Sequence, residues 1–329
     1  MSHATPTRPS RSFTLGAIAA AVLAAATGAQ AQSWPAKPIR VIEPAVAGSA
    51  VDTGMRSIAP KLSESLGQPV VIENRPGANS AIGAREAARA APDGYTVFHG
   101  NINNAFNDLL SNDPCCRLNQ ELVSVTRVFS TPMVFVVHPS VPANTLREYL
   151  DLAKGKPKGV TYASGGTGSL TQMVGEMIRS AASVDIAEIP YKSIGAEVPD
   201  LLAGHVMTGF LSPSSVVQSI RAGRLKALAL ADKSRLAILP NVPTMTEAGL
   251  PMEATGWNGL YVPAGTPEPI IRRLQQEAAK AMTAPDVRAN ATENGWVLGG
   301  EPSDVFAAYM RSELVKWGKV IKDANIKLQ

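Results

Sequence analysis

The sequence has few of the residues that build metal centres and disulfide frameworks. It contains two cysteines, the neighbours Cys115 and Cys116, and four histidines. The histidines are scattered and no HExxH or paired-cysteine spacing occurs, so no metal site is expected. Adjacent Cα atoms lie ~3.8 Å apart across a trans peptide, below the usual disulfide range of ~4.4 to 6.8 Å, so a bridge between the two cysteines would be strained. The two cysteines form that vicinal disulfide, remain as two thiols, or pair with partners elsewhere.

Motifs for nucleotide binding and nucleophilic catalysis are also missing. The glycine-rich stretch YASGGTGS has no Walker lysine, and Gly166 and Gly168 are followed by Thr171 where a dinucleotide fingerprint needs a third glycine. Ser164 and Ser169 are not in a GxSxG elbow. No cofactor is expected, and an enzyme is disfavoured because no nucleophile–base pair or metal set can be assembled.

The chain has no strong excess of charge of either sign. It contains 31 basic and 27 acidic residues, and no basic run or aromatic-interleaved patch stands out. A protein that binds nucleic acid through its phosphates usually carries such a basic surface. Nucleic acid is therefore not an expected partner.

Long hydrophobic runs are confined to the N-terminus. Arg8 and Arg11 precede an apolar, alanine-rich run at residues 13–26, and Ala29-Gln30-Ala31 follows. This order is typical of a secretory signal peptide, with cleavage after Ala31. The run is shorter than the ~20 residues of a membrane span, so a retained anchor is the weaker alternative. We expect an exported mature chain of 298 residues, whose formal charge falls from +4 to +2 because two arginines leave with the signal.

A glycine-rich loop is the most informative stretch that the sequence does contain. The segment YASGGTGS at residues 162–169 follows an apolar run. It precedes one buried helical face, formed by Leu170, Met173, Val174, Met177, Ile178 and Ala181. Ser169 and Gln172 have the spacing of a capping box. Glycines here let backbone N–H groups converge at the positive end of a helix dipole, where anions bind. A turn without a ligand remains the alternative.

A second strand–loop–helix unit lies ~120 residues earlier. Residues 39–42 predict a strand, the loop EPAVAGSA follows, and residues 51–66 predict a helix that ends at Gly67. Ser49 and Asp52 repeat the capping spacing, so we expect Asp52 to bond back to the Ser49 N–H rather than to a ligand. Two such loops can hold one small anion between two lobes.

Strands and helices alternate along the rest of the chain. This pattern predicts an α/β fold with mainly parallel sheets flanked by helices. A long β-type stretch at residues 123–137, and a Gly-Trp-Asn-Gly segment followed by a strand at residues 260–262, are expected to cross between two lobes. Two crossings imply a hinge and a ligand cleft. The expected lobes are residues 32–130 with 255–329, and residues 131–254.

Five further residues need an interpretation. Asn101 and Asn103 follow a strand in the segment GNINNAFND, at the carboxyl end where α/β sheets bind ligands. Trp257 either lines the cleft or belongs to the core. His99 is expected to be a hydrogen-bonded structural residue. Lys192 is expected to be solvated, and the alternative is that it neutralises a carboxylate.

Several motifs occur in combination: WPAKPIRVIEPAVAGSAVD, ENRPGA, PDGYT, VTYASGGTGS and GLYVPAGTPEPI. Together they resemble the tripartite tricarboxylate transporter substrate-binding proteins, the Bug receptors, over essentially the whole chain after residue 31. The resemblance implies a periplasmic receptor with the two-lobed type II binding-protein fold, which delivers a small organic carboxylate to the membrane subunits of a transporter. It places the ligand on Ala47, Gly48, Ser49, Ala50, Asp52, Ser164, Gly165, Gly166, Thr167, Gly168, Ser169 and Thr171.

The chain departs from the family pattern at positions that affect specificity. The family often has histidine where Gln172 stands, glycine where Ser193 stands, and aspartates near Met207 and Leu211. Their absence removes charged groups that would meet a ligand amine, so plain carboxylates are favoured over amino acids. A sensory receptor that reports to a membrane signalling protein remains the alternative to a transport role, since both need only a closing cleft. A monomer is expected.

Overall fold

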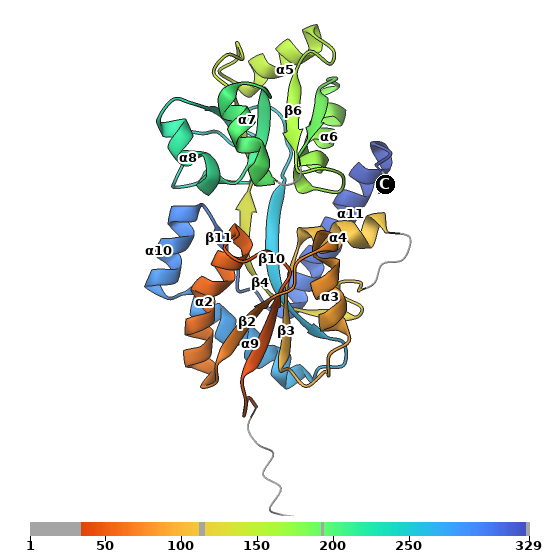
Figure 1. Ribbon diagram of the computed structural model, residues 1–329, viewed down its shortest axis with the longest axis vertical. Coiled ribbons are helices and arrows are strands. Elements are labelled where there is room, and N and C mark those ends of the chain that lie inside the picture. Colours follow the sequence, from red (N-terminus) through yellow and green to blue (C-terminus); the bar gives the residue numbers. More distant parts are fainter. Residues whose placement is uncertain (1–33, 112–115, 192–193, 327–329) are drawn as a thin grey trace, which may run out of the picture. The chain divides into compact units, whose positions relative to one another are not determined.

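The computed structural model describes residues 34–111, 116–191 and 194–326. The described residues from Lys37 onward belong to the larger of two compact units. Two sheets with flanking helices make up the larger unit (Figure 1). Cys115, Lys192 and Ser193 lie outside the described residues, so the predictions about them stay predictions. Over the ranges just given, no helix is both long and apolar enough to cross a membrane.

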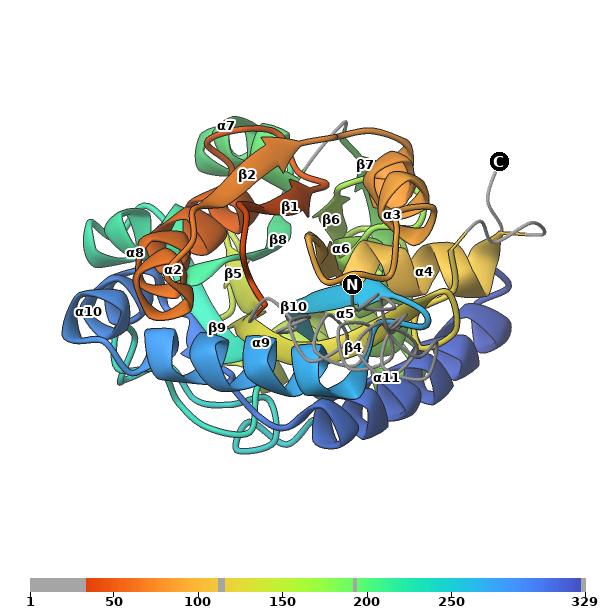
Figure 2. The same ribbon diagram turned by 90° about the horizontal axis from the view of Figure 1, so that it is seen from below.

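The first sheet has six strands in the order β11-β4-β10-β3-β1-β2. Its strands are β1 (Ile39–Glu43), β2 (Val70–Asn74), β3 (Thr96–Asn101), β4 (Leu122–Pro132), β10 (Thr255–Pro263) and β11 (Val297–Leu298). The helices that accompany it are α2 (Ala50–Leu66), α3 (Ala81–Ala88), α4 (Ile102–Leu110), α9 (Glu268–Met282), α10 (Pro285–Asn294) and α11 (Ser303–Asp323), with a short 3-10 helix η1 (Ala78–Ser80). Helices α9 and α11 both contact β4 (Figure 2).

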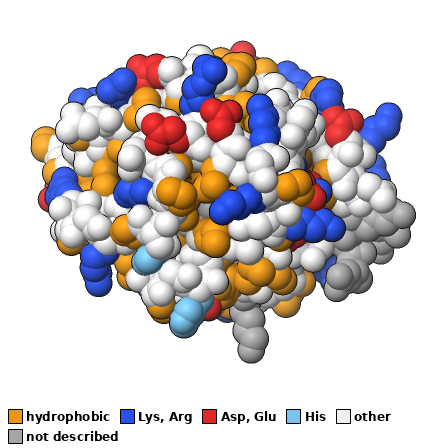
Figure 3. All heavy atoms as spheres, turned by 90° about the horizontal axis from the view of Figure 1, so that it is seen from above, with side chains coloured by type: hydrophobic (Ala, Val, Ile, Leu, Met, Phe, Trp, Pro, Cys, Tyr) orange, Lys and Arg blue, Asp and Glu red, His pale blue; other side chains and the backbone are white. Residues whose placement is uncertain are grey.

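The second sheet has five strands in the order β7-β6-β8-β5-β9. Its strands are β5 (Val134–Val137), β6 (Thr161–Ser164), β7 (Ala187–Pro190), β8 (Thr208–Leu211) and β9 (Lys226–Leu230). Its helices are α5 (Leu146–Gly155), α6 (Leu170–Ala182), η2 (Ile194–Glu197), α7 (Val198–Ala203) and α8 (Pro213–Arg221). The end of the molecule that carries this sheet shows basic and acidic side chains interspersed (Figure 3).

Both sheets are mixed, with more antiparallel pairing than the alternation of elements predicts. β1 pairs in parallel with β2 and β3, whereas β10 pairs antiparallel with β3 and β4. In the second sheet β6 pairs in parallel with β7 and β8, and β5 pairs antiparallel with β8 and β9. The antiparallel pairs arise because β4 leads the chain into the second sheet and β10 brings it back.

The two crossings of the chain run side by side. β4 and β10 pair from Leu122 with Pro263 to Pro132 with Thr255, and β5 begins two residues after Pro132. At the crossing the Met133 N–H donates to Ala254 at 3.3 Å, Ala254 to Ala231 at 3.0 Å, and Ala231 to Met133 at 2.9 Å. This ring of backbone hydrogen bonds ties both crossings to the end of β9, so a rotation of one sheet against the other would turn about it.

A glycine brings one helix of each sheet close to an aromatic ring. A Cβ on Gly54 of α2 would lie 2.4 Å from the Phe129 ring, and a Cβ on Gly175 of α6 would lie 2.3 Å from the Tyr162 ring. Each ring belongs to the sheet beneath its helix, and both are fully buried. Close packing of this kind fixes where the N-terminus of each helix lies.

Candidate functional site

The first loop lies between β1 and α2 and is closed by its own hydrogen bonds. Ser49 is the N-cap of α2, and its hydroxyl accepts from the Asp52 N–H at 3.3 Å. The Asp52 carboxylate accepts from the Gly48 N–H at 2.8 Å. The predicted bond from Asp52 to the Ser49 N–H is wrong by one residue, because that N–H donates to the Val46 carbonyl at 3.2 Å. Gly48 has φ +79°, which glycine adopts without strain.

Asp52 is 1% exposed, and its neighbours compensate its charge. Arg56 Nε and Asn74 Nδ2 each donate to its carboxylate at 2.8 Å. Burial by itself raises the pKa of Asp52, but the hydrogen bonds from Arg56, Asn74 and Gly48 outweigh burial and lower the pKa below its ordinary value. Both carboxylate oxygens therefore bind groups of the protein itself.

The second loop repeats this closure between β6 and α6. Ser169 is the N-cap of α6, and its hydroxyl accepts from the Gln172 N–H at 3.2 Å. Gln172 Oε1 accepts from the Gly168 N–H at 2.9 Å, and Gly168 has φ +75°. The Ser169 N–H donates to the Gly166 carbonyl at 3.1 Å. The two loops thus share a left-handed glycine, a serine N-cap, and a side chain at the third helical position that binds the glycine amide.

Glu188 of β7 anchors the second loop from a neighbouring strand. Its carboxylate accepts from the Ser164 hydroxyl at 2.5 Å and from the Gln172 side-chain amide at 3.1 Å. Ser164 in turn accepts from the Gly166 N–H at 3.1 Å. Sequence reasoning missed Glu188, because β7 meets β6 only in the folded sheet. Gln172, which stands where the family often has histidine, has both ends of its side-chain amide hydrogen-bonded, one to the Gly168 N–H and the other to Glu188.

The loop glycines donate internally instead of offering free amides. Besides Gly48, Gly166 and Gly168, the Gly165 N–H donates to the Thr171 hydroxyl at 2.8 Å. This differs from the expectation that glycine amides converge on a ligand. Within the described residues, the amides without a hydrogen-bond partner include those of Ala47, Ala50 and Thr167, three exposed positions at the two helix N-termini.

The turn from β3 into α4 is built from asparagines. Asn101 is the N-cap of α4, and its side chain accepts from the Asn103 N–H at 3.0 Å. The Asn101 N–H donates to the Asn104 side chain at 3.0 Å, and both of these residues also bond to Ser80. Asn101 and Asn104 are thus buried bracing groups. Asn103 is half-buried, and its side chain makes no hydrogen bond with any residue that the structure describes.

These asparagines support a left-handed turn that the sequence did not predict. Ala78, Asn79 and Ser80 have φ values of +46°, +51° and +75°. Such a backbone costs a residue with a Cβ roughly 1 to 2 kcal/mol. Asn104 donates to the Ser80 carbonyl at 3.3 Å and Asn107 to the Asn79 carbonyl at 2.7 Å. Helix α3 begins directly after this turn, at Ala81.

Trp257 and His99 are both fully buried. The Trp257 ring packs edge-on against Phe306 with 6.3 Å between ring centroids, so Trp257 is a core residue rather than a cleft wall. His99 Nδ1 lies 2.6 Å from Glu43 Oε2, so the expected hydrogen-bonded structural histidine is confirmed. Its partner Glu43 was not singled out from the sequence.

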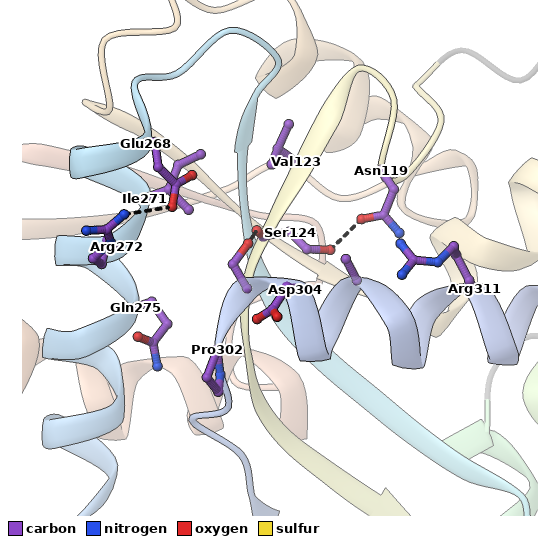
Figure 4. A pocket seen from close by; sticks show the side chains of 12 residues that line it. Asn119, Val123, Ser124, Glu268, Ile271, Arg272, Gln275, Pro302, Asp304 and Arg311 are labelled. Atoms are coloured by element: carbon purple, nitrogen blue, oxygen red, sulfur yellow. Dashed lines mark hydrogen bonds and ion pairs between the residues drawn. The ribbon is translucent and has the colours of Figure 1, made fainter.

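Two hollows on the surface lie away from both loops. A pocket of about 540 Å³ lies between α9, α11 and β4 (Figure 4). In it Arg272 lies 3.6 Å from Glu268, and the Ser124 hydroxyl donates to Asn119 at 2.7 Å. A groove of about 1140 Å³ lies between α6 and α11. No predicted site residue lines either hollow, and Arg272 is already paired, so the two loops remain the candidate site.

Two mixed sheets joined by paired crossing strands, with one closed loop–helix unit on each sheet, define the two-lobed α/β binding-protein fold. The sequence model of the tripartite tricarboxylate transporter family receptor matches residues 55–326, and the chain belongs to this family. Protein BugT of Bordetella pertussis (strain Tohama I) is 33% identical over 316 residues, which cover 95% of this chain and 96% of BugT. The family that the motifs resemble is thereby confirmed.

Solved structures share the fold. One described as a periplasmic transporter is 34% identical, with a TM-score of 0.78 over 90% of this chain and 100% of its own. An R. palustris protein solved with adipate is 27% identical, with a TM-score of 0.77 over 89% of this chain and 99% of its own. MatC from Rhodopseudomonas palustris with bound malate is 28% identical, with a TM-score of 0.73 over 88% of this chain and 100% of its own. The predicted two-lobed α/β architecture is confirmed.

Proposed function

We propose that the chain is a periplasmic solute-binding protein that captures a small organic carboxylate between its two loops. The observation that carries this proposal is the shared closure of the loops, which leaves exposed amides at two helix N-termini. Adipate and malate, the ligands of two structural neighbours, are both small dicarboxylates. The captured ligand would pass to the membrane subunits of a tripartite tricarboxylate-type transporter, and the chain itself would have no enzymatic activity.

The amides of Ala47, Ala50 and Thr167 are the proposed donors to the ligand. A hydrogen bond from a neutral group to a charged one contributes ~1.5 to 3 kcal/mol, and micromolar affinity needs about 8 kcal/mol. Three or four such bonds, with the hydroxyl protons of Ser49 and Ser169, are therefore sufficient. Asp52 and Gln172 would act beneath the ligand by holding each glycine in place.

The proposed lobes are residues 32–130 with 255–329, and residues 131–254, which hold one sheet each. Their hinge would be the ring of hydrogen bonds at Met133, Ala231 and Ala254. Binding would draw the two loops together. Small-angle scattering should then show a smaller radius of gyration with a saturating ligand, and an unchanged profile would contradict hinge closure.

Export is proposed from the N-terminal sequence. A signal peptide cleaved after Ala31 would leave a mature chain that begins at Gln32. Mass spectrometry of periplasmic material should find that N-terminus. Mature protein that still carries Met1 would refute the assignment.

Titration calorimetry with adipate and malate tests the function directly, and Ala50→Pro tests the site. Ala50 is the first residue of α2, where proline is tolerated, and Ser49 before it is extended (φ −68°, ψ 163°), as proline requires. The change therefore removes one N–H and leaves the helix intact. Loss of one charge-assisted bond should weaken binding by roughly 10- to 150-fold.

Glu268→Pro is the matched control, because Glu268 is the first residue of α9 and also follows an extended residue, Pro267 (φ −58°, ψ 135°). It should bind as the unmodified protein does. If Ala50→Pro binds the dicarboxylate as tightly as the unmodified protein does, the Ala50 amide is not part of the binding site. No binding of either dicarboxylate, or of other small carboxylates, would refute the proposed function.

A further inference from the structure

A buried acid and histidine lie directly beneath the first loop. Glu43 is the last residue of β1, His99 lies in the neighbouring strand β3, and both side chains are 0% exposed. Glu43 Oε2 lies 2.6 Å from His99 Nδ1, while Glu43 Oε1 accepts from the Ala45 N–H at 3.1 Å. The Asn74 side chain binds the Ala45 carbonyl at 2.9 Å. The N–H and the carbonyl of Ala45 are therefore both hydrogen-bonded to side chains of the sheet, the N–H to Glu43 and the carbonyl to Asn74.

Two buried polar atoms on the same sheet face have no hydrogen-bond partner among the described residues. They are His99 Nε2 and Asn258 Oδ1, and Asn258 is 5% exposed. In the antiparallel pairing of β3 and β10, His99 lies opposite Leu260 and Asn258 lies opposite Asn101. His99 and Asn258 are thus diagonal neighbours on one face, ~7 to 8 Å apart at the backbone. Side chains at this backbone spacing are within reach of each other, directly or through one small molecule.

The chemistry of the two atoms identifies the bridging molecule. Asn258 Oδ1 can only accept a hydrogen bond, whereas His99 Nε2 accepts or donates according to its tautomer. The two atoms do not bond to each other in the structure. A water molecule both donates and accepts, so it can bond to Asn258 Oδ1 and to either tautomer of His99, and buried waters occupy such places in proteins.

We propose that His99 Nε2 and Asn258 Oδ1 hold one buried water, which completes a chain of hydrogen bonds from the Ala45 N–H through Glu43 and His99 to Asn258. The last member lies in β10, the strand that returns from the second sheet. His99 and Asn258 are therefore positioning residues that tie the first loop to the crossing strand. Their effect on ligand binding rests on the proposed function, whereas the water site does not.

Residues of β4 and α2 cover the hydrogen bonds between Glu43, His99 and the proposed water. Phe129 of β4 lies 6.1 Å from His99 between ring centroids, and α2 packs on Phe129 through Gly54. Arg56 of α2 also lies near Glu43. The pKa of Arg56 is raised mainly by its hydrogen bond with Asp52, and the charge of Glu43 adds a smaller contribution. The water would thus be enclosed and long-lived.

A crystal structure of the ligand-free protein, at a resolution that shows ordered waters, tests the site itself. The expected result is one density peak within hydrogen-bonding distance of both His99 Nε2 and Asn258 Oδ1. An empty site would overturn the proposal. So would an Asn258 amide turned to donate directly to Nε2.

Hydrogen exchange of the Ala45 amide tests the connection to the loop. Asn258→Leu and His99→Phe should each speed its exchange in the ligand-free protein by about tenfold, which corresponds to loss of one hydrogen bond of ~1.4 kcal/mol. Thr126→Val is the control. It removes another buried bond of the same sheet, from Thr126 Oγ1 to the Glu301 carbonyl at 2.7 Å, outside the chain.

Exchange at Ala45 that is unchanged in Asn258→Leu, or equally fast in Thr126→Val, would overturn the positioning role. Asn258→Leu decides the matter alone where His99→Phe fails to fold. Affinity for adipate and malate should fall about tenfold in Asn258→Leu and stay unchanged in Thr126→Val. Because the crystal and exchange measurements need no ligand, failure to bind any carboxylate would refute only the proposed function.

Discussion

Replacement of Glu197 by glutamine should change how the free energy of unfolding depends on pH. Glu197 precedes α7, is 0% exposed, and has no hydrogen-bond partner for either carboxylate oxygen among the described residues. The β8 backbone packs against it, since a Cβ on Gly209 would lie 3.7 Å from Glu197 Oε1. Burial raises the pKa of Glu197 from 4.5 to about 8.

The magnitude follows from this difference in pKa. In the unfolded chain the Glu197 carboxyl loses its proton near pH 4.5, whereas the folded protein keeps it up to about pH 8. Between these values the folded state holds one more proton than the unfolded state, so the free energy of unfolding falls as pH rises. The slope is ~1.4 kcal/mol per pH unit, which amounts to roughly 5 kcal/mol over the whole window.

Urea unfolding of the unmodified protein and of Glu197→Gln, from about pH 5 to pH 8, measures this effect. Glutamine stays neutral, so the stability of the variant relative to the unmodified protein should rise steadily with pH. The comparison cancels other groups that titrate in this range, such as Asp108, whose pKa burial raises to about 7. Parallel stability curves would show that Glu197 does not keep its proton on folding, and the reasoning would fail.

Three further substitutions test the loops and their support. Gly168→Val should weaken carboxylate binding at least tenfold in calorimetry, because Gly168 has φ +75°, which a residue with a Cβ adopts only with strain. Gly155→Val is the control, since a Cβ on Gly155 meets open space, and its affinity should not change. Equal affinities of the two variants would contradict this prediction. Asp52→Asn should reduce the free energy of unfolding at neutral pH. The difference from the unmodified protein should disappear as pH falls through the pKa of Asp52, which is lowered in the folded state. A difference that stays constant during acid unfolding would contradict this prediction. Gly54→Ala places a Cβ 2.4 Å from the Phe129 ring and should lower the free energy of unfolding in urea by ~1 to 3 kcal/mol. Unchanged stability would show that α2 shifts without penalty.

The strand–loop–helix units were predictable because each is a local feature. Ser49 and Ser169 are the N-caps that the sequence predicts, and each accepts from the N–H three residues later. Spacing along the chain is enough to show this, since capping needs only residues within one helical turn. The same holds for the first crossing, whose β-type sequence is continuous apart from Pro132. In the second crossing the strand begins at Thr255, five residues before the one expected at residues 260–262.

The contacts that complete the site join distant segments, and local spacing does not show them. Glu188 reaches Gln172 across 16 residues and Ser164 across 24. The left-handed turn depends on Asn104 and Asn107, which lie 24 and 28 residues from the carbonyls that they bind. Each depends on which strands become neighbours, so it follows from the topology and not from the local pattern.

The internal hydrogen bonds of both loops bear on how the proposed site would hold an anion. Because Gly48 is bound by Asp52 and Gly168 by Gln172, the amides at the two helix N-termini are already oriented, and binding orders few further groups. The third helical residue offers no net charge in either loop, since Arg56 compensates Asp52 and Gln172 is neutral. Under the proposed function, the described residues of the two loops would attract a carboxylate through amide dipoles, which water screens strongly at an open surface and weakly in a closed cleft. Under the proposed function, firm capture of the anion would therefore require that the lobes close over it.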